Sequence, residues 1–329
     1  MDPFMGGGTS VIEGLNLGRR VIGIDLNSLA CFVTRVRTTP LSANDEATIT
    51  DWSKRAAGLP KSGRPGPTIR NMPKATKEFL ADALVLSRDL SSGTQRSFAK
   101  CVLLRLGQWA LDGREFSSLR RDRLAARLPV VADEMIEGLR QFVDFCEDFG
   151  VTKSLIKQNR RLVCRSAMGL EEDRRLVNSA RRPLLVFTSP PYPGVHVLYH
   201  RWQHRGRRET SAPYWIASLR DGNCASFYTG GSRTPTGERN YFEMITQAFS
   251  SVRAYMNPKG LVVQLVGFSN CNAQLPRYLR AMEAAGFQEC PLGPAADRLG
   301  RRVPNRKWYA RVRGSEDTAS EVLLFHRPV

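Results

Sequence analysis

Two short motifs carry residue types that suit ligand binding and group transfer. The first runs from Asp2 to Thr9 and holds three consecutive glycines just before a predicted helix. At such a turn, backbone N–H groups and the positive end of the helix dipole can receive a carboxylate or a phosphate. An apolar strand follows at 21–24 and ends on Asp25, about where a nucleotide-binding unit places a carboxylate on ribose hydroxyls. A purely structural turn before a helix is the alternative.

The second motif, Thr-Ser-Pro-Pro-Tyr at 188–192, comes directly after an apolar run that ends at Phe187. Two consecutive prolines fix a non-helical loop at the carboxyl end of a strand, where open α/β sheets bind their ligands. Ser189 and a backbone carbonyl can then hydrogen-bond an exocyclic amino group while the Tyr192 ring stacks on the base. Taken alone, the motif fits a strand terminator or a proline-rich ligand segment as well.

Together the two motifs closely resemble the cofactor and catalytic motifs of S-adenosylmethionine-dependent DNA methyltransferases that modify the exocyclic amino group of a base. The resemblance extends over residues 2–31 and 159–329. It implies that Asp25 holds the ribose, and that Ser166, after the third strand, stands where the family often has an acidic residue near the adenine ring. It also implies a cofactor pocket lined by Asp2, Phe4, Gly6, Gly8 and Thr9, and a target base held by Ser189, Pro190, Pro191 and Tyr192.

The resemblance also bears on the target base and on the reaction. In this family Ser-Pro-Pro-Tyr is commoner among N4-cytosine enzymes, whereas Asp- or Asn-Pro-Pro-Tyr is commoner among N6-adenine enzymes. An exocyclic amino nitrogen is a poor nucleophile because its lone pair is delocalised into the ring, so acceptors that favour a tetrahedral nitrogen, together with in-line orientation, supply most of the catalysis. The nitrogen is unreachable inside a duplex, which implies base flipping. A site-specific cytosine-N4 DNA methyltransferase is therefore expected; adenine N6, RNA or protein glutamine as substrate, and a non-catalytic nucleic-acid-binding remnant stay open.

The composition favours a polyanionic partner. Lys and Arg number 49 against 31 Asp and Glu, which gives a formal net charge of +18 and favours DNA through counterion release. A basic stretch after the second motif sets cationic side chains beside an aromatic ring, an arrangement that suits phosphates and an unstacked base. A solvated run of charges is the alternative. The residues expected to contact nucleic acid are Arg201, Trp202, Arg205, Arg207, Arg208 and Arg233.

Other classes of site are not expected. The seven cysteines are scattered singly with no C-x-x-C pair, so they are expected to be reduced and mostly buried. His196, His200 and His204 share a helical spacing that suits a nucleic-acid backbone better than a metal, and no metal site is predicted. No apolar run approaches the roughly 20 residues that span a bilayer, and the N-terminus lacks a signal-peptide pattern. A cytoplasmic protein is expected.

The elements that position the motifs read as an α/β fold. Helical patterns at 241–256 and 275–286 alternate with short apolar runs of strand length and composition. Such alternation predicts a mostly parallel sheet covered on both faces, here a Rossmann-like methyltransferase sheet. The predicted strands that follow the one at 21–24 are 161–164, 183–187, 261–266 and 321–325.

A helical insertion is expected to divide the sheet into a cofactor-binding half, 1–35, and a catalytic half, 159–329. The insertion, 36–158, is a possible DNA-recognition region. It opens with a segment rich in proline and glycine at 39–73 that is expected to be extended and superficial. Helices are then predicted at 79–90, at 98–109, and from Pro129 to about Gly150. The arginines of the intervening stretch 119–128 either follow a phosphate backbone or solvate a helix face.

The strand that feeds the glycine turn is the weak point of the predicted sheet. It should supply four or five apolar residues before Asp2, yet the sequence begins with Met1. A truncated first strand would expose the N–H and C=O groups of its neighbours. A misplaced start codon, a gene fragment or a partner chain that supplies the strand are the hypotheses, and a restriction-modification partner is a further one.

Overall fold

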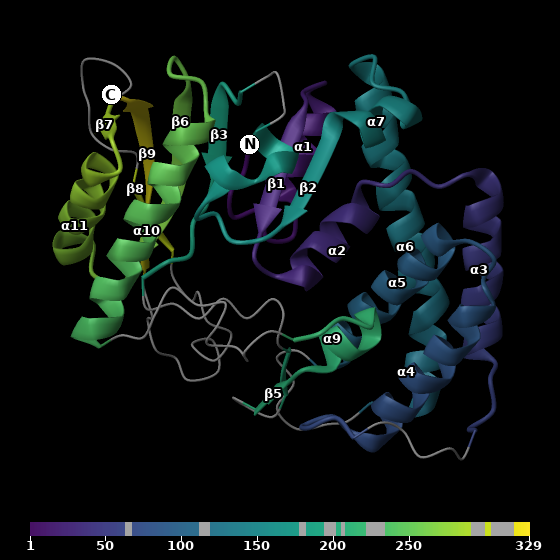
Figure 1. Ribbon diagram of the computed structural model, residues 1–329. Coiled ribbons are helices and arrows are strands. Elements are labelled where there is room, and N and C mark those ends of the chain that lie inside the picture. Colours follow the sequence, from purple (N-terminus) through teal and green to yellow (C-terminus); the bar gives the residue numbers. More distant parts are fainter. Residues whose placement is uncertain are drawn as a thin grey trace.

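The protein is described by a computed structural model over residues 1–62, 68–111, 119–177, 182–193, 202–204, 208–221, 234–290, 300–303 and 319–329. In these ranges it is a mixed α/β structure, with a sheet and its helices on one side and a helical unit on the other (Figure 1). The α/β class expected from the alternating patterns is thereby confirmed. None of the helices in the described ranges is long and apolar enough to cross a membrane.

Two pairs of parallel strands form the centre of the sheet. Strand β1 (Val21–Asp25) pairs with β2 (Arg160–Cys164), and β3 (Leu185–Thr188) pairs with β6 (Leu261–Phe268). All four coincide with predicted strands. Of these, β1 and β6 are largely buried along their length, as expected for central parallel strands, whereas β2 and β3 keep exposed residues.

The far edge of the sheet is antiparallel. Strand β9 (Ala319–Pro328) runs antiparallel to β6 and also pairs with β7 (Phe287–Glu289) and β8 (Gly300–Val303). The predicted strand at 321–325 is therefore correct in position but longer than expected. The sheet is parallel at its centre and antiparallel at this edge.

Residues Met1 and Asp2 lie between the two parallel pairs. Asp2 forms a parallel bridge with Gly23, and its N–H donates to the Ile22 carbonyl at 2.8 Å. On the other side, the N–H of Phe187 donates to the Met1 carbonyl at 3.0 Å. The two residues thus occupy the place of the expected central strand, and the chain continues from them to β1 and β2 on one side and later to β3 and β6 on the other.

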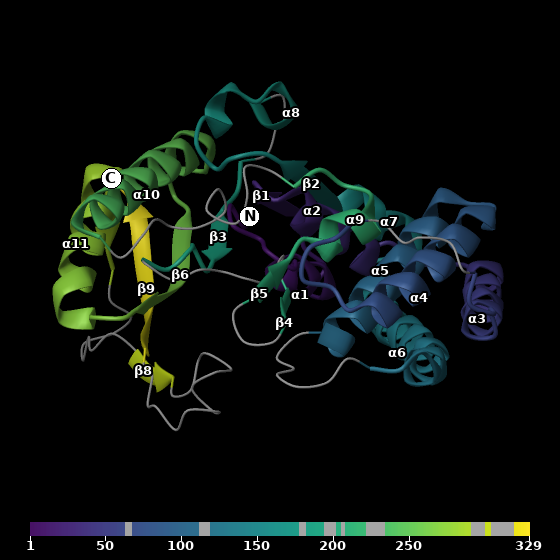
Figure 2. The ribbon, with the colours of Figure 1, turned by 90° about the horizontal axis from the view of Figure 1, so that it is seen from below.

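Apolar side chains pack against both faces of the sheet at β1, since neighbouring residues of a strand point to opposite faces, whereas Leu185 and Phe187 of β3 are exposed. On one face, Val21 belongs to a core with α1 (Thr9–Asn16) and α2 (Ser28–Arg37). On the other, Ile24 belongs to a core with α10 (Pro235–Tyr255) and α11 (Cys271–Ala284), which lie side by side in Figure 2. Short helical turns at Leu170–Glu172 (η2) and Arg174–Val177 (α8) pack beside α10.

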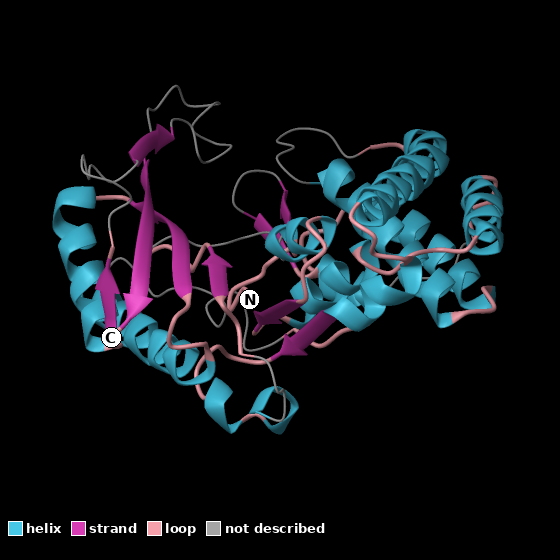
Figure 3. Ribbon diagram, turned by 90° about the horizontal axis from the view of Figure 1, so that it is seen from above, coloured by secondary structure: helices cyan, strands magenta, loops and turns pink. Residues whose placement is uncertain are grey.

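The helical unit is centred on α5 (Gly93–Leu111), most of whose residues are buried, as expected for a helix in the middle of a bundle. Figure 3 shows the surrounding helices as a cluster on the side of the molecule away from the large sheet. A 3₁₀ turn at Ser87–Asp89 (η1) leads into α5. The surrounding helices are α3 (Ala43–Ala57), α4 (Lys74–Leu86), α6 (Arg121–Asp148) and α7 (Lys153–Asn159).

The prediction of an extended segment over 39–73 was wrong, because α3 lies within it. Ser42 and Asp45 form a capping box: the Ser42 hydroxyl accepts from the Asp45 N–H at 3.1 Å, and the Asp45 carboxylate accepts from the Ser42 N–H at 3.1 Å. Ile49 and Trp52 are then buried on one face at helical spacing. The flanking prolines bound the helix and do not exclude it.

Helix α6 begins at Arg121, earlier than the start predicted after Pro129, and keeps this proline inside it. Burial of Leu124 and Leu128 in the helical core offsets the backbone hydrogen bond that proline cannot donate. The Arg121 guanidinium lies 2.9 Å from the Asp82 carboxylate, so this arginine is paired inside the helical unit. That contact favours the interpretation in which the arginines of 119–128 lie on a helix face, over the one in which they follow a phosphate backbone.

Part of the segment 159–329, the predicted catalytic half, packs on the helical unit. The hairpin of β4 (Trp202–His204) and β5 (Arg208–Thr210), and the short helix α9 (Ala212–Ala217), join the core around α5. The Tyr214 hydroxyl donates to the Asn27 side-chain oxygen at 3.1 Å, which ties α9 to the segment that follows β1. The helical unit is therefore built from more of the chain than the predicted insertion.

Candidate active site

The glycine turn lies against α2. Gly6 and Gly8 have φ angles of +51° and +82°, a conformation that side chains rarely adopt. A Cβ atom on Gly8 would lie 2.4 Å from Cγ2 of Thr34, so the turn also has no room for a side chain there. The Thr34 hydroxyl donates to the Gly6 carbonyl at 3.2 Å and holds the turn in place. Thr9, the first residue of α1, is exposed.

Asp25 ends β1 directly beside this turn. One carboxylate oxygen accepts from the Gly6 N–H at 2.8 Å, and the other accepts from the Asn27 N–H at 2.8 Å. Burial raises the pKa of Asp25 to about 6, although both hydrogen bonds act to lower it. Each carboxylate oxygen has a further lone pair, so Asp25 can accept from hydroxyl groups while it holds the turn.

Asp2 lies underneath the turn and is buried, with 5% of its surface exposed. Its carboxylate accepts from the Phe4 N–H at 3.0 Å, from the Thr188 hydroxyl at 2.6 Å and from the Ser10 hydroxyl. Burial raises the pKa of Asp2, and these hydrogen bonds oppose the rise. The contacts make Asp2 a link between the glycine turn, α1 and the end of β3.

The two sequence motifs therefore meet. Thr188, the last residue of β3, touches Asp2 although 186 positions separate them in the chain. Because β1 and β3 flank residues 1–2, their carboxyl ends lie at the same edge of the sheet, and the chain connections diverge there. Open α/β sheets bind ligands at such a switch point.

The loop after β3 is held by hydroxyl groups. The Ser189 hydroxyl donates to the Tyr192 oxygen at 3.2 Å, and the Tyr192 hydroxyl donates to the Glu321 carboxylate at 3.1 Å. The Tyr241 hydroxyl donates to the Pro191 carbonyl at 2.8 Å. Glu321 and Tyr241 were not identified from the sequence, since they are 129 and 50 positions from their partners. For Glu321, the sequence offered one indication: it is a single acidic residue at the start of a predicted apolar strand.

Several expected site residues surround this edge. Tyr192 is only 9% exposed and packs in the core beneath α10, so stacking of its ring on a base stays a prediction. Phe4 is half-buried, with its ring centroid 6.2 Å from that of Phe249. Ser166, also half-buried, accepts from the Met168 N–H at 3.1 Å in the loop that follows β2.

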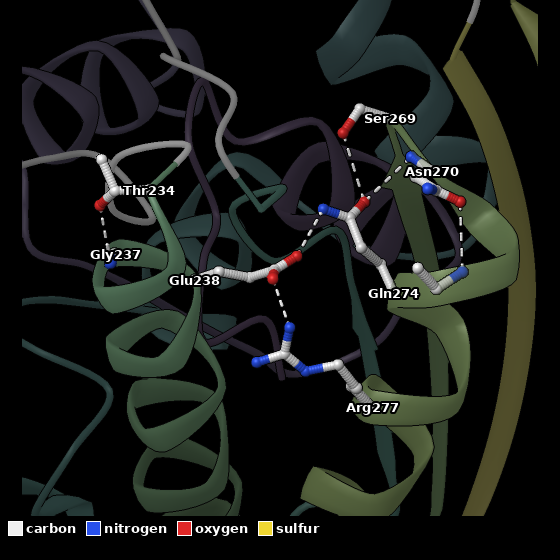
Figure 4. A network of polar contacts seen from close by, with 8 residues as sticks. Thr234, Gly237, Glu238, Ser269, Asn270, Gln274 and Arg277 are labelled. Carbon is white, nitrogen blue, oxygen red and sulfur yellow. Dashed lines mark hydrogen bonds and ion pairs between the residues drawn. The ribbon is translucent and has the colours of Figure 1, made fainter.

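A polar network lies at the neighbouring carboxyl end of β6 (Figure 4). Glu238, in the first turn of α10, accepts from the Gln274 amide at 2.9 Å and from the Arg277 guanidinium. The Gln274 oxygen in turn accepts from the Asn270 N–H at 3.2 Å. These contacts fix the start of α10 against α11, on the side of the sheet from which the loop after β3 is supported.

The expected nucleic-acid contacts are only partly visible. Arg208 is exposed on β5, consistent with a surface role. Trp202 is 3% exposed, and a Cβ on Gly107 would lie 2.6 Å from its ring, so the indole belongs to the helical core and is not available to stack on a base. The expectation for Trp202 was wrong because tertiary burial of a large apolar ring outweighed its basic sequence neighbours. Outside the described residues lie Arg201, Arg205, Arg207, Arg233, His196 and His200.

The described ranges also show where the metal-ligating and thiol side chains lie. No group of His, Cys, Asp or Glu side chains in these ranges is arranged to hold a metal ion. The cysteines described are free thiols. Cys31, Cys101 and Cys146 are buried as expected, whereas Cys164, at the end of β2, is exposed.

Comparison with known proteins finds a short similarity. A segment of 40 residues is 50% identical to the Type II methyltransferase M.MvaI of Kocuria varians. The segment covers 12% of this chain and 9% of that protein. No protein-family model matches the chain, and no solved structure matches it. The chain therefore has partial similarity to a Type II methyltransferase.

Proposed function

We propose that the protein is an S-adenosylmethionine-dependent DNA methyltransferase that modifies the exocyclic amino group of a flipped base, cytosine N4 in preference to adenine N6. The observation that carries the proposal is the contact between Thr188 and Asp2, which sets the glycine turn and Asp25 beside the Ser-Pro-Pro-Tyr loop. The 40-residue similarity to a Type II methyltransferase supports the same reaction class. The strand order, with helices on both faces, is consistent with a Rossmann-like sheet.

The residues around the turn fit this cofactor. The left-handed glycines keep side chains out of the turn, and the Asp25 carboxylate retains lone pairs for a pair of ribose hydroxyls. When bound, S-adenosylmethionine supplies the methyl group, whose bond to sulfur breaks as a bond to the amino nitrogen forms and one amino proton passes to water. The residues that would hold it are Asp25, Phe4, Gly6, Gly8, Thr9 and Ser166, with Asp2 supporting the turn from below.

The loop after β3 supplies acceptors for the amino group. The Pro191 carbonyl is already bound by Tyr241, so we assign the Pro190 carbonyl and the Ser189 hydroxyl to the two amino N–H groups. Acceptors at these positions stabilise a tetrahedral nitrogen more than a planar one, which lowers the barrier to transfer. Tyr192 would position the base from the same loop.

DNA is the polyanion proposed to bind the basic surface. The net charge of +18 favours phosphate contacts, and Arg208 is an exposed member of the expected set. On the basis of sequence we propose Arg201, Arg205, Arg207 and Arg233, which lie outside the described residues, as further phosphate contacts. A restriction enzyme that reads the same site would be the corresponding partner.

The test is transfer of labelled methyl groups to DNA of mixed sequence, followed by digestion to nucleosides and chromatography. We expect label in N4-methylcytosine; label in N6-methyladenine would correct the base and retain the reaction. Asp25→Ala should abolish the heat of S-adenosylmethionine binding, whereas Asp51→Ala, on the exposed face of α3, should leave it unchanged. The proposal is contradicted if the unmodified protein shows no heat of S-adenosylmethionine binding, or if the label appears in RNA alone.

A further inference from the structure

A chain of three side chains links the loop after β3 to strand β9. Ser189 donates to Tyr192 at 3.2 Å, and Tyr192 donates to Glu321 at 3.1 Å. Glu321 is 3% exposed and Tyr192 is 9% exposed, so both hydrogen bonds lie largely out of water. Ser189 is exposed at the open end of the chain. The hydroxyl that faces the substrate side is thus connected to a buried acid.

Glu321 sets the donor-to-acceptor direction of these two hydrogen bonds. A carboxylate can only accept hydrogen bonds, so the Tyr192 hydroxyl must use its single proton on Glu321. The Tyr192 oxygen can then only accept from Ser189, which commits the single Ser189 proton to it. The Ser189 oxygen is left with lone pairs alone for a substrate. A hydroxyl that would otherwise rotate between donor and acceptor becomes an acceptor.

The loop after β3, which carries Ser189 and Tyr192, is fixed by further contacts. The Tyr241 hydroxyl, on the buried face of α10, donates to the Pro191 carbonyl at 2.8 Å, and the rings of Pro190 and Pro191 restrict the backbone that leads to it. Glu321 itself stands in the ladder between β6 and β9, opposite Gly267. Both ends of the chain are therefore fixed by the sheet and its covering helix.

We propose that Glu321 is a positioning residue that acts through Tyr192 to hold the Ser189 hydroxyl as a hydrogen-bond acceptor, so that the site selects bases with an amino group, and not a carbonyl, at the position of cytosine N4 or adenine N6. The inference rests on the proposed function and specifies its substrate chemistry. Cytosine N4 and adenine N6 donate hydrogen bonds, whereas thymine O4 and guanine O6 accept them. A fixed acceptor favours the first pair and places lone pair against lone pair with the second.

The test compares three variants of the full chain in the methyl-transfer assay at saturating cofactor. Tyr192→Phe removes both hydrogen bonds and keeps the ring, while Glu321→Gln removes the charge that sets their direction. Each should lower the rate on the order of tenfold, with cofactor affinity by calorimetry unchanged. The double variant should lose no more than either single variant, because all act on one chain of bonds. Tyr278→Phe, which removes a buried hydroxyl bound to Gln264 in the same core, should keep the full rate.

The outcomes separate the two proposals. Full transfer by the unmodified protein together with full rates for Tyr192→Phe and Glu321→Gln would overturn the role of Glu321 and leave the methyltransferase assignment intact. Rate losses that multiply in the double variant, or that also occur in Tyr278→Phe, would reduce these contacts to general packing and overturn it as well. No transfer by the unmodified protein would remove the proposed function and this inference with it. If Glu321→Gln fails to fold, Tyr192→Phe decides alone.

Discussion

Replacing Gly8 by alanine tests whether the glycine turn is held by steric fit. An alanine at φ +82° costs about 1–2 kcal/mol because its Cβ approaches the following carbonyl. The same Cβ would lie 2.4 Å from Cγ2 and 2.5 Å from Oγ1 of Thr34, so α2 must shift at a further cost of about 1–3 kcal/mol. We expect Gly8→Ala to lower the free energy of unfolding by about 2–5 kcal/mol.

Two other glycines serve as matched controls. Gly6 has a φ of +51° but nothing within 4 Å of a built Cβ, so Gly6→Ala should cost only the backbone part, about 1–2 kcal/mol. Gly138 lies on the exposed face of α6 with open space around it, and Gly138→Ala should stabilise the protein by about 0.5–1 kcal/mol.

Urea unfolding, followed by circular dichroism, measures the three differences on equal terms. A second-site change sharpens the test: Thr34→Ala removes two of the three closest atoms, so the double variant with Gly8→Ala should recover part of the loss. The steric reasoning fails if Gly8→Ala costs no more than Gly6→Ala, or if Thr34→Ala brings no recovery.

Two further predictions concern titratable groups. The pKa of Asp25 is raised by burial from its ordinary 3.8 to about 6, so between these values the unfolded chain loses its proton first and stability falls as pH rises, by on the order of 3 kcal/mol. The difference in unfolding free energy between the unmodified protein and Asp25→Asn should therefore change across pH 4 to 7; a constant difference would refute the assignment. For the thiols, Cys164 is exposed, whereas Cys101 is buried with its pKa raised by burial, so iodoacetamide should label Cys164 in the folded protein and Cys101 only after unfolding. Mass spectrometry of the labelled peptides checks this, and early labelling of Cys101 would contradict the packing around α5.

The sequence was most informative where local pattern decides structure. The apolar run that became β6 was visible because a strand buried on both faces needs a nearly uninterrupted series of such residues. Helix α3 was missed because the prolines around it outweighed the capping box between Ser42 and Asp45, a signal of two residues only. Trp202 was misassigned because its neighbours in sequence are basic, whereas its neighbours in space are apolar.

The residues of the candidate site also differ in how far the sequence alone reveals them. The turn, Asp25 and the Ser-Pro-Pro-Tyr loop each stand in a recognisable stretch of sequence, so their residue types could be identified from it. The partners that orient them could not: Glu321 comes from the last strand and Tyr241 from α10, and such contacts depend on the register of distant elements. The same limit hid the internal partners of Asp2.

The position of Met1 and Asp2 between β1 and β3 has a consequence for synthesis on the ribosome. Met1 and Asp2 cannot complete their hydrogen bonds until Leu185 to Thr188 have left the exit tunnel. The helical unit waits longer still, since Trp202 and α9 fill its core. Neither the sheet nor the helical unit can therefore complete its packing strictly in the order of synthesis.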